Sequence, residues 1–208
     1  MSLYVRRGRI NDIPKLISIY NHYVENSYAT FDLQPWTVQD KEPWFIDMFS
    51  HLTEEMKHLF HHHHAEHADP APNNVLLVCA EEQQKEPIVA GSSEAPLDLP
   101  PGDEDSIVGY AYFCDYRSAR RAYARTKEAS VYVHHEQLKR GIASLLYKEL
   151  IVDAREEGVH ALMAFTGGTN VGSSNLHKKF NFEKVGHFKE TGWKFNQWHD
   201  NEIFQLLL

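Results

Sequence analysis

The stretch SVYVHHEQLKRGIASLLYKELIVDA, from Ser130 to Ala154, decides the fold. It begins with β-branched and aromatic residues and no breaker, which predicts a short strand from Ser130 to Val133. After a polar turn, Gly141 opens a segment with apolar residues at helical spacing: Ile142, Leu145, Leu146, Leu150 and Ala154. A basic, glycine-containing turn at a helix N-terminus leaves backbone N–H groups without intrahelical partners, and these suit a phosphate or pyrophosphate. The alternative is a plain connection that binds nothing.

This turn and helix resemble the acyl-CoA-binding element of the GNAT N-acetyltransferases. The usual pattern there is Arg or Gln, two residues, Gly, one residue, then Gly or Ala. Gly141 and Ala143 fill the last two fixed places, whereas Leu138 stands where Arg or Gln is usual. The resemblance therefore implies a cradle of backbone N–H groups without a side-chain contact from residue 138.

Other segments resemble one branch of that family, the phosphinothricin and methionine sulfoximine acetyltransferases. They are IYNHYVENSYATFD (Ile19 to Asp32), RRAYARTKEASVYV (Arg120 to Val133), NVGSSNLHKKFNF (Asn170 to Phe182) and GWKFNQWHD (Gly192 to Asp200). Their order and separations match, and the resemblance covers nearly the whole chain apart from two insertions.

The resemblance implies an α/β (α+β) GNAT fold, in which a mixed, mostly antiparallel sheet is splayed at one parallel strand pair. It implies transfer of acetyl from acetyl-CoA to the primary amine of a small amino acid or analogue. Neither Cys79 nor Cys114 has a neighbouring His or Lys to lower its pKa, so direct attack in a ternary complex is expected over a covalent route. The resemblance also implies a homodimer, to whose interface or neighbouring pocket Trp193, Phe195 and Trp198 contribute, unless all three pack in the monomer's own core. The cofactor-binding residues it implies are Val131, Val133, Leu138, Lys139, Arg140, Gly141, Ile142, Ala143, Ser144, Asn170 and Ser173.

Bulk properties agree with one cytoplasmic domain spanning residues 1–208. Hydrophobic residues make up 42% of the chain, and no apolar run approaches the ~18 residues that span a bilayer. Four basic residues interrupt the N-terminal segment, which argues against a secretory signal. Cys79 and Cys114, in apolar runs, are expected to be reduced and buried. The formal charge of −8 argues against a nucleic-acid partner.

Hydrophobic patterning predicts the remaining elements. The expected strands are Leu3 to Arg7, Val75 to Ala80, Ile107 to Cys114, Glu128 to Val133, His160 to Thr166, Glu183 to His187 and Glu202 to Leu207. One helix is expected from the cap Asn11 to about Val24, a second from Thr37 to Leu52, and two more from Gly141 and Asn170. The strand–helix–strand unit around Gly141 favours parallel pairing of its two strands.

Two stretches do not fit the core pattern. The first, at about 54–74, contains HHHHAEH (His61 to His67), and the second, at about 83–105, is rich in Pro, Gly and acidic residues. His61 and His64, or His63 and His67, would share a helix face and could ligate Zn²⁺. No companion Cys or carboxylate pattern supports this, so we expect exposed loops and no metal requirement.

Two residues are candidates for acid–base catalysis. Glu128, at the start of the strand before the turn, could accept the proton of the acceptor amine through a water, or could simply face solvent. His177 lies seven residues after Asn170, where many GNAT enzymes carry a Tyr that protonates the CoA thiolate. It could serve as that acid or as a further base, or could be a surface histidine. By resemblance Asn170 bonds the pantetheine arm; taken alone it reads as a helix cap.

Four residues match positions that surround the acceptor in the resembling branch. Arg120 and Tyr123 lie over the acceptor site there, where an Arg can hold a carboxylate or phosphinate. Phe31 and Tyr132 match pocket walls. The alternatives are acetylation of another small amine or of a protein amine, and, outside the enzymes, an acyl-CoA-binding or His-cluster metal-binding protein.

Overall fold

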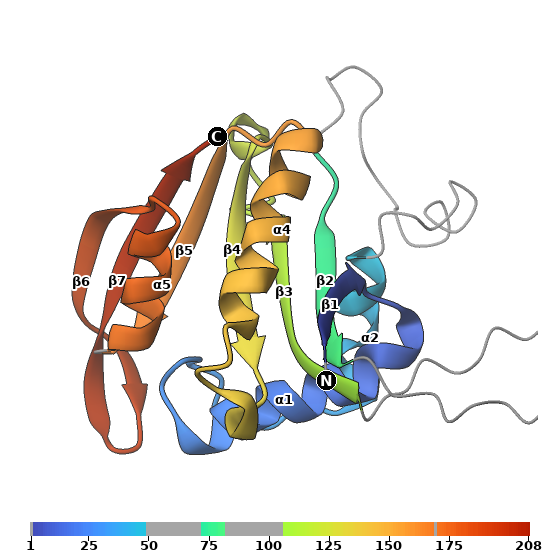
Figure 1. Ribbon diagram of the computed structural model, residues 1–208. Helices are drawn as coiled ribbons and strands as arrows, with labels where there is room; N and C mark the ends of the chain where they lie inside the picture. The colour runs from blue at the N-terminus through green and yellow to red at the C-terminus, as the bar shows by residue number, and fades with distance from the viewer. Residues whose placement is uncertain (1, 49–71, 82–105, 169) are drawn as a thin grey trace, which may run out of the picture.

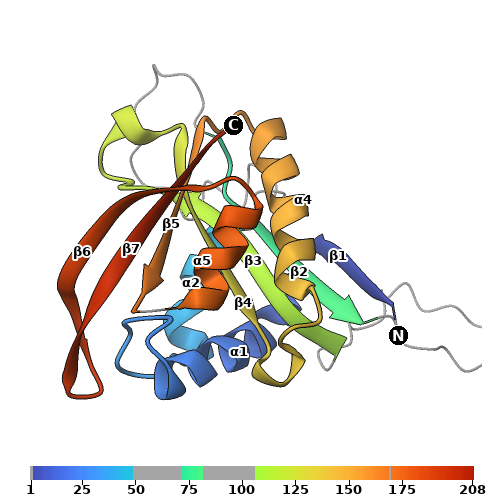
Figure 2. The same cartoon turned by 60° about the vertical axis from the view of Figure 1, so that its left-hand side comes forward.

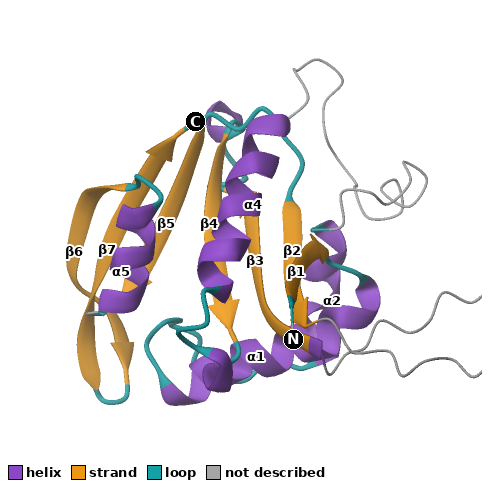
Figure 3. Ribbon diagram, in the orientation of Figure 1, coloured by secondary structure: helices purple, strands orange, loops and turns teal. Residues whose placement is uncertain are grey.

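The computed structural model describes residues 2–48, 72–81, 106–168 and 170–208. Within these ranges seven strands form one sheet in the order β1-β2-β3-β4-β5-β7-β6 (Figures 1 and 3). The strands are β1 (Leu3–Arg7), β2 (Val75–Glu81), β3 (Ile107–Asp115), β4 (Thr126–Val133), β5 (Ala161–Gly167), β6 (Glu183–Lys194) and β7 (Gln197–Leu207). All neighbouring pairs are antiparallel except β4 and β5, which are parallel, so the expected fold class is confirmed.

The sheet separates two apolar cores, because successive side chains of a strand point to opposite faces. On β2, Val75 and Leu77 belong to the core under α4 (Ile142–Glu156), whereas Leu76 and Val78 belong to the core under α1 (Ile13–Asn26) and α2 (Val38–Asp47). The short helix α5 (Val171–Lys179) packs beside β5 and β7 on the α4 side (Figure 2).

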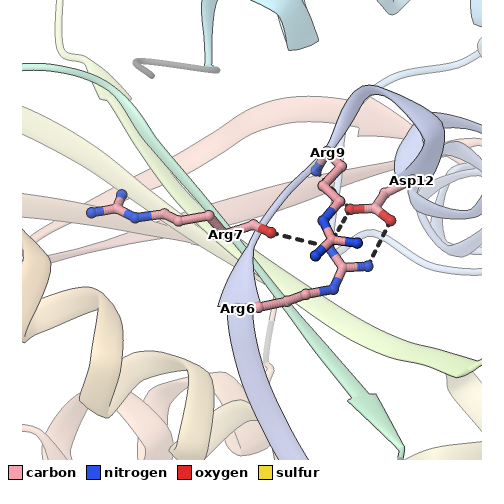
Figure 4. A network of polar contacts seen from close by, with 4 residues as sticks. All are labelled: Arg6, Arg7, Arg9 and Asp12. Atoms are coloured by element: carbon pink, nitrogen blue, oxygen red, sulfur yellow. Dashed lines mark hydrogen bonds and ion pairs between the residues drawn. The ribbon is translucent and has the colours of Figure 1, made fainter. Parts of the chain in front are cut away.

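The start of α1 differs from the prediction. Residues Ile10–Asp12 form a 3₁₀ turn, and Asp12, not Asn11, is the residue that precedes the helix. The Asp12 carboxylate is buried and accepts two hydrogen bonds from the guanidinium of Arg6 and one from the backbone N–H of Arg9 (Figure 4). These contacts tie Asp12 to β1, so the chain enters the α-helix one residue later than the cap pattern indicates.

The predicted start of the second helix at Thr37 is confirmed to within one residue, because α2 begins at Val38. The Thr37 hydroxyl accepts from the backbone N–H of Asp40, and the Asp40 carboxylate accepts in return from Thr37. The predicted end of this helix beyond Met48 lies outside the described residues. The two predicted insertions do too, apart from residues 72–74.

The last two strands are much longer than predicted. Lys194 pairs with Gln197, so only Phe195 and Asn196 connect β6 to β7, and both have positive φ, 51° and 57°. Two positive φ angles are typical of the tight turn that matches the twist of a hairpin. Because this turn contains no glycine, sequence patterning ends both strands too early.

Candidate active site

The site begins where β4 and β5 separate. Their parallel pairing covers only Thr126–Glu128 and Ala161–Met163, and beyond it the strands diverge (Figure 1). The gap opens into a cleft of about 470 Å³ between β4, β5, α4 and α5. A parallel pair that ends early leaves strand edges free to bond an extended ligand.

The turn before α4 closes one end of the cleft. Gly141 precedes the helix in the left-handed conformation, with φ of 81°, and Lys139 is also left-handed, with φ of 63°. The first turn of α4 presents N–H groups without intrahelical partners, at the positive end of the helix dipole. The turn can therefore hold an anion, as its sequence predicts.

Ten of the eleven predicted cofactor-binding residues line this cleft. The exception is Arg140, whose guanidinium pairs with the carboxylate of Glu81 at 2.5 Å and also bonds Gln137. The lining residues are Val131, Val133, Leu138, Lys139, Gly141, Ile142, Ala143, Ser144, Asn170 and Ser173.

Asn170 is the cap of α5, as predicted. Its side-chain oxygen accepts from the backbone N–H of Ser173 at 3.0 Å. Across the cleft, the ammonium of Lys179 donates to the Ser144 hydroxyl at 2.9 Å, which joins α5 to the first turn of α4. No local sequence pattern indicates Lys179 as a site residue, because only the fold brings the two helices together.

Glu128 lies at the point of separation. It is the last residue of β4 that pairs with β5, opposite Met163. Ala129 and Val133 pack in the α4 core, so strand alternation places Glu128 and Tyr132 on the opposite, α1 face. Burial alone raises the pKa of the Glu128 carboxyl, and no described charge offsets it. Such a carboxylate can accept a proton near neutral pH.

His177 lines the cleft but is no surface residue. Its ring is 2% exposed and stacks on Phe204 at 4.8 Å. Its Nε2 lies 2.9 Å from the Tyr147 hydroxyl, whereas its Nδ1 is buried without a hydrogen-bond partner. Burial lowers the pKa of His177 to about 4, so the imidazole is neutral at pH 7.

Tyr147 and Thr166 also line the cleft and were not singled out from the sequence. Tyr147 sits among the apolar positions of α4, where an aromatic residue reads as core. The buried Thr166 hydroxyl of β5, like Nδ1 of His177, has no partner among the described residues. Such atoms usually find partners in native proteins, so both point to a ligand in the cleft.

The segment after α1 carries Phe31, a predicted pocket wall, and packs against β5 and β6. Its Phe31 ring lies against Gly167 of β5 and Gly192 of β6, and a Cβ on Gly192 would overlap that ring. The buried ammonium of Lys194 donates to the carbonyl of Thr30 at 2.8 Å. Lys194, which no local sequence pattern indicates, therefore ties this segment to the β6–β7 hairpin and holds Phe31 in place.

The predicted acceptor residues are only partly brought together. Tyr132 lines the cleft. Tyr123 connects to it through Tyr116, whose ring lies 5.5 Å from Tyr123 and 6.3 Å from the cleft residue Phe165. Arg120 is exposed and outside the cleft lining.

The described residues hold neither a metal-ligating cluster nor a membrane-spanning helix. No group of three or more metal-ligating side chains occurs in the described parts of the chain, and the His61–His67 cluster lies outside them. No described helix is long and apolar enough to cross a bilayer.

Known proteins are similar to this chain in sequence and in fold. The model of the acetyltransferase (GNAT) family matches residues 39–182. The chain is 30% identical over 196 residues to a phosphinothricin N-acetyltransferase of Streptomyces coelicolor, covering 94% of this chain and 91% of the relative. It is 27% identical over 208 residues to an L-methionine sulfoximine/L-methionine sulfone acetyltransferase of Pseudomonas paraeruginosa, covering 100% and 96%.

Solved structures of acetyltransferases have a similar fold. An N-acetyltransferase of Staphylococcus aureus superposes with a TM-score of 0.74 at 26% identity, covering 100% of this chain and 99% of that one. A phosphinothricin acetyltransferase of Sinorhizobium meliloti, solved in complex with acetyl-CoA, has a TM-score of 0.75 at 22% identity, covering 100% and 89%. The latter likeness shows the fold alone.

A splayed parallel pair, an anion-binding turn and a free carboxylate at the point of separation define an acyl-CoA-dependent transferase. The chain belongs to the GNAT family and is an acetyl-CoA-dependent N-acetyltransferase. The cleft fits that co-substrate: it offers backbone N–H donors at one end, apolar walls along β4, and two unpartnered polar atoms deeper inside.

Proposed function

We propose that the protein transfers acetyl from acetyl-CoA to the primary amine of a small amino acid or amino-acid analogue, of the phosphinothricin or methionine sulfoximine type. The observation that carries the proposal is Glu128, a half-buried carboxylate at the point where β4 and β5 separate. The names of two relatives that span almost the whole chain support the acceptor class.

When bound, acetyl-CoA supplies the acetyl group as a thioester. The turn from Leu138 to Ser144 binds its pyrophosphate, and Asn170 bonds the pantetheine arm. Glu128 accepts the proton of the acceptor amine, directly or through a water. As the amine adds and the C–S bond of the thioester breaks, CoA leaves as the thiolate. His177, neutral at pH 7, donates a hydrogen bond to that sulfur and does not act as a charged acid. No metal takes part in this scheme.

Direct attack of the amine is the simplest route. A covalent route would need an activated thiolate. Cys79 is fully buried in β2, and burial raises its pKa to about 11. That thiol is therefore a poor nucleophile, which supports a ternary complex of enzyme, acetyl-CoA and amine.

We also propose that the acceptor carries a negative charge that an arginine binds. The 3₁₀ turn Arg121–Tyr123 follows Arg120. The ring of Tyr123 packs on Tyr116, and Tyr116 packs on Phe165, which lines the cleft. A nearby guanidinium can bind a carboxylate or phosphinate through paired hydrogen bonds. We assign this contact to Arg120.

We expect carboxylate-bearing amines to react faster than the same compounds as amides. Losing a charge-assisted contact costs about 1.5–3 kcal/mol, or roughly one to two orders of magnitude in kcat/KM. Arg120→Ala should remove that preference without changing the affinity for acetyl-CoA. The measurement is CoA release with matched amino acids and amino-acid amides.

Two neighbouring arginines serve as controls. Arg121→Ala removes an exposed charge from the same turn and should keep the preference. Arg117 stacks on Tyr116 and Tyr123, so loss of the preference in Arg117→Ala alone would move the contact to that residue. If polyamines or lysine-bearing peptides outpace every free amino acid, the amino-acid assignment is wrong.

We also propose that the protein is a homodimer assembled through the β6–β7 hairpin. Trp193, Phe195 and Trp198 are 50%, 50% and 57% exposed, so the alternative that all three pack in the monomer's core is wrong. The rings of Trp193 and Trp198 pack edge to face, with their centroids 5.2 Å apart. Phe188, on the edge strand β6, is also exposed. Clustered exposed aromatics are typical of an interaction surface.

Light scattering at micromolar concentration should give twice the 24.1 kDa mass of one chain. Trp198→Lys should shift the protein toward monomer, because it places a charge within the aromatic cluster. Val152→Lys, at an exposed apolar site on the distant helix α4, is the control and should leave the mass unchanged. A single 24.1 kDa species in the wild type would reject the dimer.

A further inference from the structure

Tyr147 and His177 form a buried polar pair in the wall of the acyl-CoA cleft. They come from different helices, α4 and α5, and their side chains meet at 2.9 Å between the Tyr147 hydroxyl and Nε2 of His177. Tyr147 is 1% exposed and His177 2%. Phe182 and Phe204 pack around the imidazole, so the ring cannot turn freely.

The direction of this hydrogen bond determines the state of the imidazole. A neutral imidazole carries one proton, on either Nδ1 or Nε2, and the other nitrogen accepts. A phenol is a stronger acid than a neutral imidazole N–H, and an imidazole nitrogen is a stronger base than a phenol oxygen. Tyr147 therefore donates and Nε2 accepts, which leaves the proton of His177 on Nδ1.

Nδ1 then becomes a buried donor without an acceptor. It is one of three buried side-chain atoms in the described residues that lack a partner, and two of these residues, His177 and Thr166, line the same cleft. Buried polar groups are rarely left unpaired in native proteins, and an exception indicates a catalytic role or a missing ligand. The acceptor for Nδ1–H is therefore expected on the acyl-CoA, at its sulfur or a carbonyl oxygen.

We infer that Tyr147 is a positioning residue that fixes His177 in the Nδ1–H tautomer, so that this N–H is the donor offered to the acyl-CoA. The inference rests on the proposed role of His177 and adds a residue that acts through it. Tyr147 itself stays protonated throughout, and no proton leaves its hydroxyl.

The direct test uses ligand-free protein labelled with ¹⁵N in its histidines. Nitrogen shifts distinguish a protonated from an unprotonated ring nitrogen, and the spectrum of His177→Asn identifies the His177 signals among those of the 14 histidines. The wild type should show a protonated Nδ1 and an unprotonated Nε2 at pH 7. A protonated Nε2 in the wild type overturns the inference, whatever any variant does.

The second test is Tyr147→Phe, which removes only the hydroxyl. His177 should then populate the Nε2–H tautomer, and kcat should fall about 10- to 100-fold, less than the ~10²–10³ lost when a transition-state donor is deleted outright. The KM for the amine should change less than about twofold, because the amine loses no direct contact. The affinity for acetyl-CoA should fall about 2- to 10-fold, the value of the one hydrogen bond that Nδ1–H no longer donates. Tyr110→Phe, at another buried tyrosine on β3, is the matched control and should retain kcat.

The two tests separate this inference from the proposed function. Wild-type kcat and tautomer in Tyr147→Phe would overturn the role of Tyr147 while leaving Glu128 and the acceptor class intact. Absence of turnover with every amine would instead reject the proposed function, and the nitrogen shifts of ligand-free protein would still decide the tautomer.

Discussion

Glu128→Gln is expected to lower kcat by about 10²–10⁴-fold, the range typical of losing a general base. The amide has the shape of the carboxylate but cannot take the proton of the amine. Affinity for acetyl-CoA should not change, because Glu128 points to the α1 face and is not among the cleft residues. Steady-state kinetics together with calorimetric titration of acetyl-CoA would measure both quantities.

The pH profile gives this prediction a second readout. Burial raises the pKa of Glu128, and the base works only when ionised, so kcat/KM should rise with pH through a pKa above the ordinary value for glutamate. Glu128→Gln should lose this acidic limb. The control is Glu149→Gln on α4, where the carboxylate is exposed beside Lys148, and it should keep both rate and profile. Wild-type turnover in Glu128→Gln would remove the residue from the mechanism.

Local sequence was sufficient where neighbouring residues determine the structure. The strand, turn and helix around Gly141 lie within one segment, and hydrophobic spacing, one glycine and a basic turn predict their order. The strand begins earlier than predicted, at Thr126, and the turn contains a short 3₁₀ helix, His135–Gln137. Parallel pairing of β4 with β5 followed because a helix that connects two strands of one sheet favours it. The cap Asn170 is likewise local, since its side chain bonds the backbone three residues later.

Contacts between distant segments could not be predicted in this way. Tyr147 and His177 are 30 residues apart, and only the packing of α5 beside α4 joins them. No role was predicted for Lys194, yet its ammonium bonds a carbonyl 164 residues earlier. Arg140 was predicted to bind the cofactor, but its guanidinium forms an ion pair with Glu81 on β2. In each case the partner comes from another element, and no local pattern reports it.

Gly141→Asp is expected to abolish measurable binding of acetyl-CoA, with a loss of at least about 100-fold in affinity. A carboxylate there would lie beside the pyrophosphate, and two unit charges about 5 Å apart repel by about 1–3 kcal/mol at effective dielectric constants of 80–20. The pyrophosphate carries two such charges, and the carboxylate also competes for the N–H groups of the first turn of α4.

Gly141→Asn separates charge from backbone strain. The φ of 81° is left-handed, a region that Asn and Asp both tolerate better than other side chains, so both variants should carry a similar folding cost. No described atom lies within 4 Å of a Cβ at this position, so neither side chain meets a steric obstacle at that atom. The Asn variant should therefore fold like the Asp variant but keep most of its acetyl-CoA affinity.

The measurement is thermal stabilisation by acetyl-CoA, which raises the melting temperature by mass action when the ligand binds only the native state. Wild type and Gly141→Asn should be stabilised, and Gly141→Asp should not. The deficit of the Asp variant should shrink at high ionic strength, since salt screens a repulsion between partly exposed charges. An equal loss in both variants would mean that backbone conformation, and not charge, controls the turn. A wild type that saturating acetyl-CoA does not stabilise would contradict the pyrophosphate cradle itself.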